Sequence, residues 1–350
     1  METNTKQVKV AINGLGRIGR AFLKLAIKEP RLKVVAVNDL GELDNLAYLL
    51  RYDSAYGPSG LRITTNRNES ANAEELVVEG QAIKFLQIKD PAQLPWGALG
   101  VEVVVESTGI FETYVKARTH LDAGAHKVVV TAPVKGEAVP GVIGATVLMG
   151  INDDKLGTCQ ISSNASCTTN SASPVIQIML EAVGIEKAIL NTVHGYTATQ
   201  KLVDAPDAKD WRRGRAAAHN IVPSTTGAAI SVTEAIPALK NLFDGIALRV
   251  PVLTGSIADI TFLAKRNTSA SEINEILRKA AKEPRWQGIF TVTDEPLVSS
   301  DIVGSPYASI ADLALTKVVA GNLVKIMAWY DNELGYTHTL IRHVIKAGQS

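Results

Sequence analysis

Hydrophobic runs alternate with helix-like spacings in the first half of the chain. Four runs predict buried strands: Val8–Asn13, Leu32–Asn38, Val101–Val105 and Lys127–Thr131. Between them, apolar residues recur at helical spacing over Ile18–Ile27, and Glu112–Ala123 predicts a second helix. Buried strands alternating with helices are typical of a parallel α/β sheet. We therefore expect the first half to be a Rossmann-like domain of this class.

The second half has a different pattern, one of helices beside short strands. The expected helices are Val175–Val183, Gly227–Leu239 and Ser271–Ala281. The expected strands are Ala188–Val193, Ile246–Val250, Ala258–Ala264 and Leu323–Tyr330. This arrangement predicts an α+β domain with a mixed or antiparallel sheet.

Domain boundaries follow from this change of pattern, which lies near Ser163–Cys167. We expect a first domain over 1–165 and a second over 166–332. A last helix over 333–350 has no strand after it, and we expect it to complete the first domain. The segment Thr197–Pro223 has no clear period, and loops of this length are usually functional or lie at a subunit contact.

Composition narrows the function classes. The 350 residues contain 46% hydrophobic and 20% charged residues, as in ordinary globular proteins. A net charge of +1 argues against dedicated nucleic-acid binding. No apolar run reaches the ~20 residues that span a bilayer, and the first seven residues show no signal-peptide core. The two cysteines favour a reducing, cytoplasmic setting, and no residue cluster indicates a metal.

A glycine motif indicates a dinucleotide site. Gly14, Gly16 and Gly19 form Gly-x-Gly-x-x-Gly between an expected strand and an expected helix, and Asp39 follows 20 residues later. The helix N-terminus would receive the diphosphate, and the Asp39 carboxylate would receive the ribose hydroxyls. A negative charge at Asp39 also repels the 2′-phosphate of NADP, so the pattern favours NAD. A tight turn without a ligand is the alternative interpretation.

Cys167 is the candidate nucleophile. Small polar residues before and after it are typical of a helix start, and a thiol at a helix N-terminus is expected to have a lowered pKa. His194, at the end of an expected strand, is the candidate base. Each residue alone is more often structural, and Cys159, in an apparent strand, has no expected role.

Eight segments together resemble phosphorylating glyceraldehyde-3-phosphate dehydrogenase, in that family's order and spacing. They are Asn13–Arg20, Ser107–Phe111, Ala165–Asn170, His194–Gln200, Asp210–Ala216, Pro223–Ala228, Arg249–Pro251 and Tyr330–Glu333. The resemblance implies oxidation of glyceraldehyde 3-phosphate with NAD and inorganic phosphate, through a thiohemiacetal and a thioester on Cys167. It also implies a homotetramer, with the loop around Lys209–Arg215 at a subunit contact.

Site residues are implied by the same resemblance. The substrate phosphate would meet Thr197, Thr199 and Arg249. The attacking phosphate would meet Ser166, Thr168, Thr226, Gly227 and Arg213. The implied NAD ligands are Asn13, Gly14, Gly16, Arg17, Ile18, Gly19, Asp39, Lys89, Ser107, Thr108, Gly109, Thr131, Asn332 and Tyr336. His194 would activate Cys167, whereas loss of Arg249 would leave the thiol pKa almost unchanged.

Some residues depart from the family pattern. Gly195 replaces the usual Ser after the histidine, Lys89 stands where Arg is usual, and Thr254–Ser256 replaces an Asn-Val-Ser-like run. Two other functions remain open at this point. One is a sister enzyme that oxidises erythrose 4-phosphate; the other is a regulatory or RNA-binding protein that uses the dinucleotide groove as a sensor.

Overall fold

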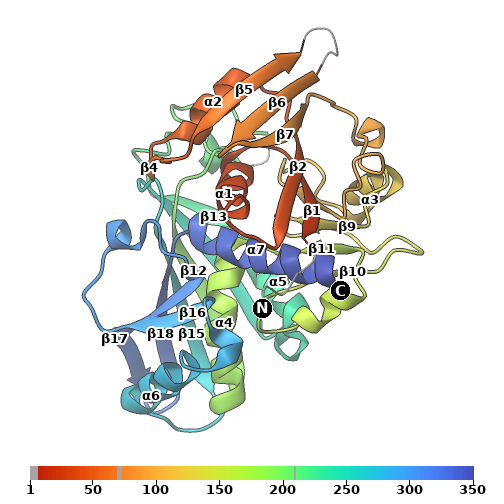
Figure 1. Ribbon diagram of the computed structural model, residues 1–350. Helices are drawn as coiled ribbons and strands as arrows, with labels where there is room; N and C mark the ends of the chain where they lie inside the picture. The colour runs from red at the N-terminus through yellow and green to blue at the C-terminus, as the bar shows by residue number, and fades with distance from the viewer. Residues whose placement is uncertain (1–6, 69–72, 209) are drawn as a thin grey trace. The chain divides into compact units, whose positions relative to one another are not determined.

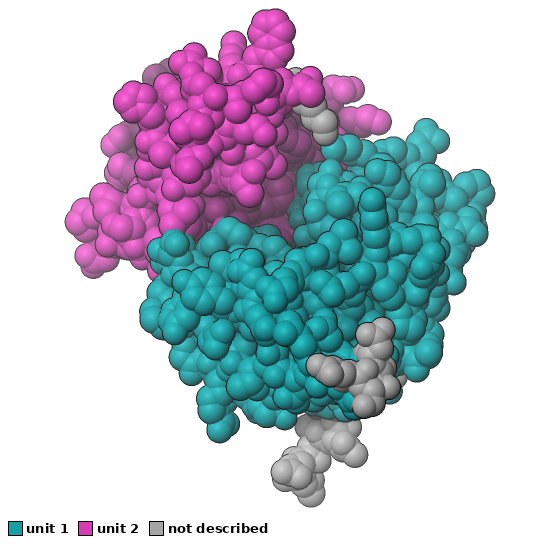
Figure 2. All heavy atoms as spheres, turned by 90° about the horizontal axis from the view of Figure 1, so that it is seen from above, with its two compact units in different colours: residues 1–147, 152–165, 340–350 teal, residues 148–151, 166–339 magenta. Residues whose placement is uncertain are grey.

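The computed structural model describes residues 7–68, 73–208 and 210–350. They form two compact units, coloured separately in Figure 2. Unit 1 comprises Met1–Val147, Asn152–Ala165 and Leu340–Ser350, and unit 2 comprises Leu148–Ile151 and Ser166–Thr339. None of the helices in the described part of the chain has the length and apolar character needed to cross a lipid bilayer.

Unit 1 is built on a nine-stranded sheet in the order β10-β11-β9-β8-β1-β2-β7-β6-β5 (Figure 1). Its strands are β1 (Val8–Asn13), β2 (Leu32–Asn38), β5 (Ile63–Asn68), β6 (Ala73–Val78), β7 (Gln81–Leu86), β8 (Val103–Glu106), β9 (Lys127–Val130), β10 (Gly144–Thr146) and β11 (Ile161–Ser163). Every pairing from β10 to β7 is parallel, and β6 and β5 add an antiparallel edge.

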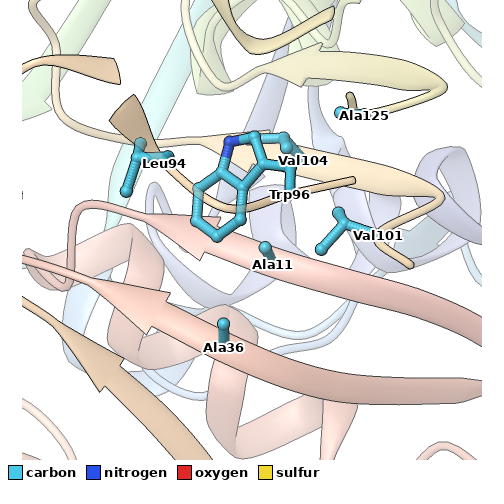
Figure 3. Packing of buried hydrophobic residues seen from close by; sticks show 7 residues of the cluster. All are labelled: Ala11, Ala36, Leu94, Trp96, Val101, Val104 and Ala125. Atoms are coloured by element: carbon cyan, nitrogen blue, oxygen red, sulfur yellow. The ribbon is translucent and has the colours of Figure 1, made fainter. Parts of the chain in front are cut away.

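Three helices accompany this sheet: α1 (Arg17–Ala26), α2 (Leu43–Arg51) and α3 (Tyr114–Asp122). A two-stranded ribbon of β3 (Tyr52–Asp53) and β4 (Gly57–Pro58) follows α2. Small residues of β1 and β2, Ala11 and Ala36, leave room for the fully buried indole of Trp96 (Figure 3). Burial of a side chain of this size stabilises the fold by roughly 2–3 kcal/mol.

Unit 2 contains a seven-stranded sheet in the order β13-β14-β12-β15-β18-β17-β16. Its strands are β12 (Ile185–Gly195), β13 (Val222–Thr225), β14 (Phe243–Val250), β15 (Ser256–Ala264), β16 (Phe290–Thr293), β17 (Ser309–Val319) and β18 (Leu323–Tyr330). Two pairs, β12–β14 and β16–β17, are parallel and the other pairs are antiparallel, so the sheet is mixed.

Its helices are α4 (Cys167–Ala182), α5 (Ala228–Ala235) and α6 (Ala270–Ala280). The long helix α4 contacts β12, β15, β17 and β18 of the same unit. The last helix, α7 (Leu334–Gln349), is divided between the units after Thr339.

The expected fold class is confirmed, with a mainly parallel sheet in unit 1 and a mixed sheet in unit 2. Some elements differ from the expectation. Helix α4 begins at Cys167, eight residues before the apolar stretch, and α5 ends before Pro237 because proline cannot continue a helix. Cys159 follows a short 3₁₀ helix and is not in a strand. Lys209, in the loop expected at a subunit contact, lies outside the described residues.

Candidate active site

The carboxyl edge of the unit 1 sheet collects the residues expected to bind the dinucleotide. The glycine turn follows β1, Asp39 follows β2, Ser107–Gly109 follows β8, and Thr131 follows β9. These strands are parallel, so their carboxyl ends meet at one edge, where ligands of open α/β sheets bind. Lys89 lies three residues beyond β7 and is exposed.

The glycine turn is closely packed at Gly14 and Gly19 and open at Gly16. Gly14 has φ +95°, and a Cβ there would lie 2.8 Å from backbone atoms of Ser107 and Thr108. A Cβ on Gly19 would lie 2.1 Å from the Gly14 carbonyl oxygen, whereas a Cβ on Gly16 would meet nothing within 4 Å. Helix α1 begins after Gly16 without a side-chain cap, which leaves N–H groups of its first turn for an anion. This geometry fits a pyrophosphate.

Asp39, expected to bind the ribose, also supports the glycine turn. Its Oδ2 accepts a 2.6 Å hydrogen bond from the N–H of Leu15, and its Oδ1 accepts a 2.8 Å bond from the N–H of Gly41. Each carboxylate oxygen can accept a second donor. The Arg17 guanidinium, beside the same turn, donates to Asp53 at 3.1 Å.

A buried carboxylate, Glu106, lies at the end of β8 beneath this turn. Its Oε2 lies 2.6 Å from Nδ2 of Asn13 and 3.0 Å from Nε2 of His120, and its Oε1 accepts from the N–H and hydroxyl of Thr108. The Trp96 indole N–H donates to Nδ1 of His120 at 3.1 Å, so Nε2 carries the proton toward Glu106. The network fixes Asn13 and Thr108. Glu106 and His120 carried no recognisable sequence signal.

Cys167 is the first residue of α4 in unit 2. The hydroxyl of Ser166 caps this helix by accepting a 3.1 Å bond from the N–H of Thr169. Cys167 as a whole residue is partly exposed, and its Sγ lies 3.3 Å from Nε2 of His194. The structure therefore brings together the two residues predicted as nucleophile and base.

His194 and Arg249 are partners on adjacent parallel strands, β12 and β14. Nδ1 of His194 lies 2.6 Å from the Gly195 carbonyl oxygen and 2.5 Å from Nη1 of Arg249. The same Nη1 donates to the Gly195 carbonyl at 3.3 Å. A guanidinium only donates, so Arg249 favours Nδ1 as an acceptor, whereas the Gly195 carbonyl favours a proton on Nδ1. Nε2 can accept the thiol proton only in the second of these tautomers.

Electrostatics at this pair differ from the sequence expectation. Burial raises the pKa of the Cys167 thiol, and the Arg249 guanidinium and the helix N–H of Thr168 offset this only in part. The net direction is opposite to the expected lowering, because desolvation outweighs the helix terminus. Burial and Arg249 lower the pKa of His194 to about 3. The pair is therefore a thiol beside a neutral imidazole at neutral pH.

Comparisons with known proteins agree with this geometry. Residues 8–114 match the model of the NAD-binding domain of glyceraldehyde 3-phosphate dehydrogenase, and residues 166–332 match the model of its C-terminal domain. The chain belongs to this family. A relative from Mycobacterium avium, named glyceraldehyde-3-phosphate dehydrogenase, is 46% identical over 98% of this chain and 99% of its own length.

Other members of the glyceraldehyde-3-phosphate dehydrogenase family are similarly related. The Geobacillus stearothermophilus enzyme is 44% identical over 95% of this chain and 96% of its own, and one from Kluyveromyces lactis is 43% identical over 96% and 99%. The matched NAD-binding domain contains the glycine turn, Asp39 and Ser107–Gly109. NAD is the cofactor of this chain, and the open, uncapped turn fits it.

Hydroxyl and guanidinium groups predicted to bind phosphate lie in unit 2. The hydroxyls of Thr197 and Thr199 are 3.0 Å apart just beyond β12. Arg213 is anchored by two bonds, 3.1 and 2.8 Å, to the Ser224 hydroxyl of β13. Thr226 and Gly227 precede α5, where the Thr226 hydroxyl accepts from the N–H of Ala228.

Tyr330 is a site residue to which the sequence analysis gave no role. Its buried hydroxyl lies 2.9 Å from the Thr168 hydroxyl and 2.7 Å from the Thr192 hydroxyl, and its ring meets the His194 ring edge-on. Burial raises the pKa of this phenol, so it stays protonated. The segment Tyr330–Glu333 was noticed as a motif, which was the available signal.

Asn332 and Tyr336, predicted to bind NAD, are both buried in unit 2. Oδ1 of Asn332 accepts from the N–H of Gly255 at 3.1 Å and from the Ser256 hydroxyl at 3.0 Å. The amide is therefore held in one orientation, with Nδ2 as the group left to donate.

Proposed function

We propose that this enzyme oxidises D-glyceraldehyde 3-phosphate to 1,3-bisphosphoglycerate with NAD and inorganic phosphate, as in glycolysis and gluconeogenesis. The contact of 3.3 Å between Sγ of Cys167 and Nε2 of His194 carries this proposal. Family membership and the NAD-binding domain match support the reaction class.

Covalent chemistry begins at the thiol. Sγ attacks the aldehyde carbon while Nε2 of His194 receives the thiol proton, and the product is a thiohemiacetal. His194 then exchanges protons with the thiohemiacetal oxygen. Bound NAD supplies the hydride acceptor. Loss of the hydride and of the hydroxyl proton leaves a thioester on Cys167. An oxygen of inorganic phosphate attacks that thioester, the C–S bond breaks, and the thiolate returns.

Two anion sites serve this reaction. Thr197, Thr199 and Arg249 hold the phosphate of the aldehyde, because hydroxyls and a buried guanidinium suit phosphate oxygens. The hydroxyls and N–H groups of Ser166, Thr168, Thr226 and Gly227, with Arg213, hold the attacking phosphate.

Cofactor binding is divided between two sets of residues. Those at the carboxyl edge of unit 1 hold the adenosine, ribose and pyrophosphate, and the Asp39 carboxylate favours NAD over NADP. Asn332, just before α7, donates from Nδ2 to the nicotinamide carboxamide. Tyr336, in the first turn of α7, belongs to the same set. The full unit 1 set is Asn13, Gly14, Gly16, Arg17, Ile18, Gly19, Asp39, Lys89, Ser107, Thr108, Gly109 and Thr131.

A homotetramer in the cytoplasm completes the proposal, with 1–165 plus 333–350 as the NAD-binding domain and 166–332 as the catalytic domain. Apolar side chains on the loop after β12 support an oligomer. Leu202, Val203, Ile221 and Trp211 are exposed, the last by 88%, and aromatic side chains such as tryptophan are enriched at protein interfaces.

The test is NADH formation from glyceraldehyde 3-phosphate, with and without inorganic phosphate, and from erythrose 4-phosphate. We expect rapid, phosphate-dependent turnover of the first aldehyde and slow turnover of the second. Cys167→Ser should abolish turnover and keep NAD binding, whereas Cys159→Ser should retain activity. More than about one percent of wild-type activity in Cys167→Ser would overturn the thiol mechanism.

A further inference from the structure

Three donors converge on one atom, Oδ1 of Asn332. They are the N–H of Gly255 at 3.1 Å, the hydroxyl of Ser256 at 3.0 Å and the hydroxyl of Thr254 at 3.3 Å. A backbone N–H can only donate, so the acceptor identity of Oδ1 follows from chemistry. Rotation of the amide by half a turn would place its NH₂ group against all three donors.

Ser256 is itself oriented by a fixed donor. Its Oγ accepts a 3.2 Å bond from the N–H of Gly195, at the end of β12. With an accepted bond on that side, the single hydroxyl proton of Ser256 is directed to Oδ1 of Asn332.

Thr254 has a comparable position, between two acceptors. Its hydroxyl lies 3.3 Å from Oδ1 of Asp331 as well as 3.3 Å from Oδ1 of Asn332. Asp331 is held by the N–H groups of Gly304, Glu333 and Leu334 at 2.8 to 2.9 Å. The single hydroxyl proton of Thr254 is shared between these two acceptors, so Thr254 supports the observed Asn332 orientation less strongly than the Gly255 N–H and the Ser256 hydroxyl do.

Gly255 allows the third donor to aim at Oδ1. Its φ of +94° is rarely adopted by other residues, and a Cβ there would lie 2.3 Å from the Ser299 carbonyl oxygen. The peptide is consequently fixed with its N–H toward Asn332. Thr254, Gly255 and Ser256 together surround a single face of the amide.

We infer that Thr254 and Ser256 are positioning residues that hold the Asn332 amide as a donor to the carboxamide oxygen of nicotinamide. The inference rests on the proposed function and extends it to residues that do not touch the cofactor. In this orientation Asn332 recognises the nicotinamide through its carboxamide oxygen and makes no hydrogen bond to the carboxamide NH₂ group. Without the two hydroxyls only the Gly255 N–H still opposes a turned amide, so a larger share of the molecules presents Oδ1, an acceptor, to the nicotinamide.

Three ligands distinguish these orientations in a calorimetric binding experiment. NAD carries both carboxamide groups, its 3-acetylpyridine analogue keeps the carbonyl oxygen and lacks the NH₂ group, and ADP-ribose lacks the nicotinamide. The variants are Thr254→Val, Ser256→Ala and the double variant, with Thr254→Ser as the conservative rescue. Thr316→Val and Ser309→Ala are matched controls, because both hydroxyls are buried in β17 without a hydrogen-bond partner.

Expected results follow from the number of donors removed. Each lost hydrogen bond should weaken NAD binding about three- to tenfold, and ADP-ribose binding should stay within about twofold of wild type. The analogue should lose more affinity than NAD in the double variant, since a turned amide can still accept from the NAD carboxamide NH₂. Thr254→Ser and both controls should behave as wild type.

Two results would overturn the inference. One is unchanged binding of NAD and its analogue by the double variant; the other is an equal loss for all three ligands, which would indicate general damage to the fold. A wild-type protein that binds ADP-ribose and NAD equally, yet oxidises glyceraldehyde 3-phosphate, would also contradict it and leave the proposed function intact. Failure of the wild type to bind any of the ligands would instead contradict the proposed function.

Discussion

The guanidinium of Arg249 lies against the imidazole of His194, with Nη1 2.5 Å from Nδ1. The two residues are register partners on the parallel strands β14 and β12, so the backbone sets their closeness. This cation disfavours a second positive charge on the buried ring, and it stabilises negative charge on the nearby thiol. Arg249 therefore influences both members of the Cys167–His194 pair besides its proposed contact with substrate phosphate.

Removal of this cation should change thiol reactivity. In Arg249→Ala we expect the pKa of Cys167 to rise further, because the guanidinium is the strongest influence that lowers it. The sequence expectation of an almost unchanged thiol pKa in this variant was therefore wrong. Alkylation by iodoacetamide, measured against pH, should shift to higher pH. The shift should be smaller in Arg249→Lys, which keeps a positive charge. An unchanged alkylation profile in Arg249→Ala would contradict the electrostatic role.

The same variant separates substrate-phosphate binding from chemistry. A hydrogen bond to a charged group contributes about 1.5–3 kcal/mol. Its loss should therefore lower kcat/KM for glyceraldehyde 3-phosphate by about 10- to 150-fold, in addition to any effect on the thiol. Unphosphorylated glyceraldehyde should show only the effect on the thiol. Equal losses for both aldehydes would mean that Arg249 does not bind the substrate phosphate.

His194→Asn tests the base. We expect the rate of acylation and hydride transfer to fall by ~10²–10⁴, the usual effect of a positioned acid–base group. The imidazole is neutral at neutral pH, since its pKa is lowered to about 3. Its loss should therefore shift the alkylation profile of the free enzyme less than Arg249→Ala does. Single-turnover kinetics and the alkylation series check both statements, and a larger shift in His194→Asn would contradict a neutral resting imidazole.

Local sequence signals were sufficient to predict the parts of the site that lie within one βαβ unit or at one helix start. The glycine turn, Asp39 and the strands around them follow from spacing alone, because a βαβ unit fixes their separation along the chain. Cys167 at a helix start was predictable from the small polar residues beside it. The expected helical stretch Val175–Val183 nevertheless omitted the first eight residues of α4, because the buried, mostly polar run Thr168–Ser173 and Pro174 obscure the hydrophobic period.

Long-range contacts were not predictable in the same way. Nothing local indicates that Arg249 meets His194, 55 residues away, or that Ser256 bridges Gly195 and Asn332. The direction of the Cys167 pKa shift was also missed, because desolvation depends on what packs around the thiol. Such features arise only when β12, β14, β15 and β18 assemble into one sheet.

The preference for NAD over NADP should depend on Asp39. The structure adds that replacing Asp39 should also weaken the binding of NAD itself, which the sequence did not indicate. Asp39→Ala removes the charge that repels a 2′-phosphate, so the ratio of kcat/KM for NAD to that for NADP should narrow. It also removes the acceptor for the N–H groups of Leu15 and Gly41, so NAD binding itself should weaken. Asp39→Asn keeps the side-chain volume and one acceptor oxygen, and should narrow the ratio with less loss. An unchanged ratio in both variants would contradict the role of this charge.

Acid sensitivity should arise in part from His343, which lies buried in α7 between two polar partners of unit 1. Nε2 is 2.7 Å from the Ser162 hydroxyl and Nδ1 is 3.1 Å from Oδ1 of Asn164, an arrangement that satisfies a neutral ring. Burial lowers the pKa of His343 to about 3, from an ordinary value of 6.5. Between these values the unfolded chain binds the proton and the folded chain does not, so the free energy of unfolding falls as pH decreases.

A pH series of thermal unfolding tests this directly. One such group lowers the free energy of unfolding by about 1.4 kcal/mol for each pH unit below ~6.5, and His194 adds a similar contribution. His343→Gln should unfold at a lower temperature at pH 7, because it disturbs both hydrogen bonds, but its midpoint should then fall less steeply between pH 6.5 and 4.5. His126→Gln, at an exposed position, is the matched control and should follow the wild type. If His343→Gln and wild type lose stability in parallel as the pH falls, the protonation of His343 does not contribute to acid unfolding.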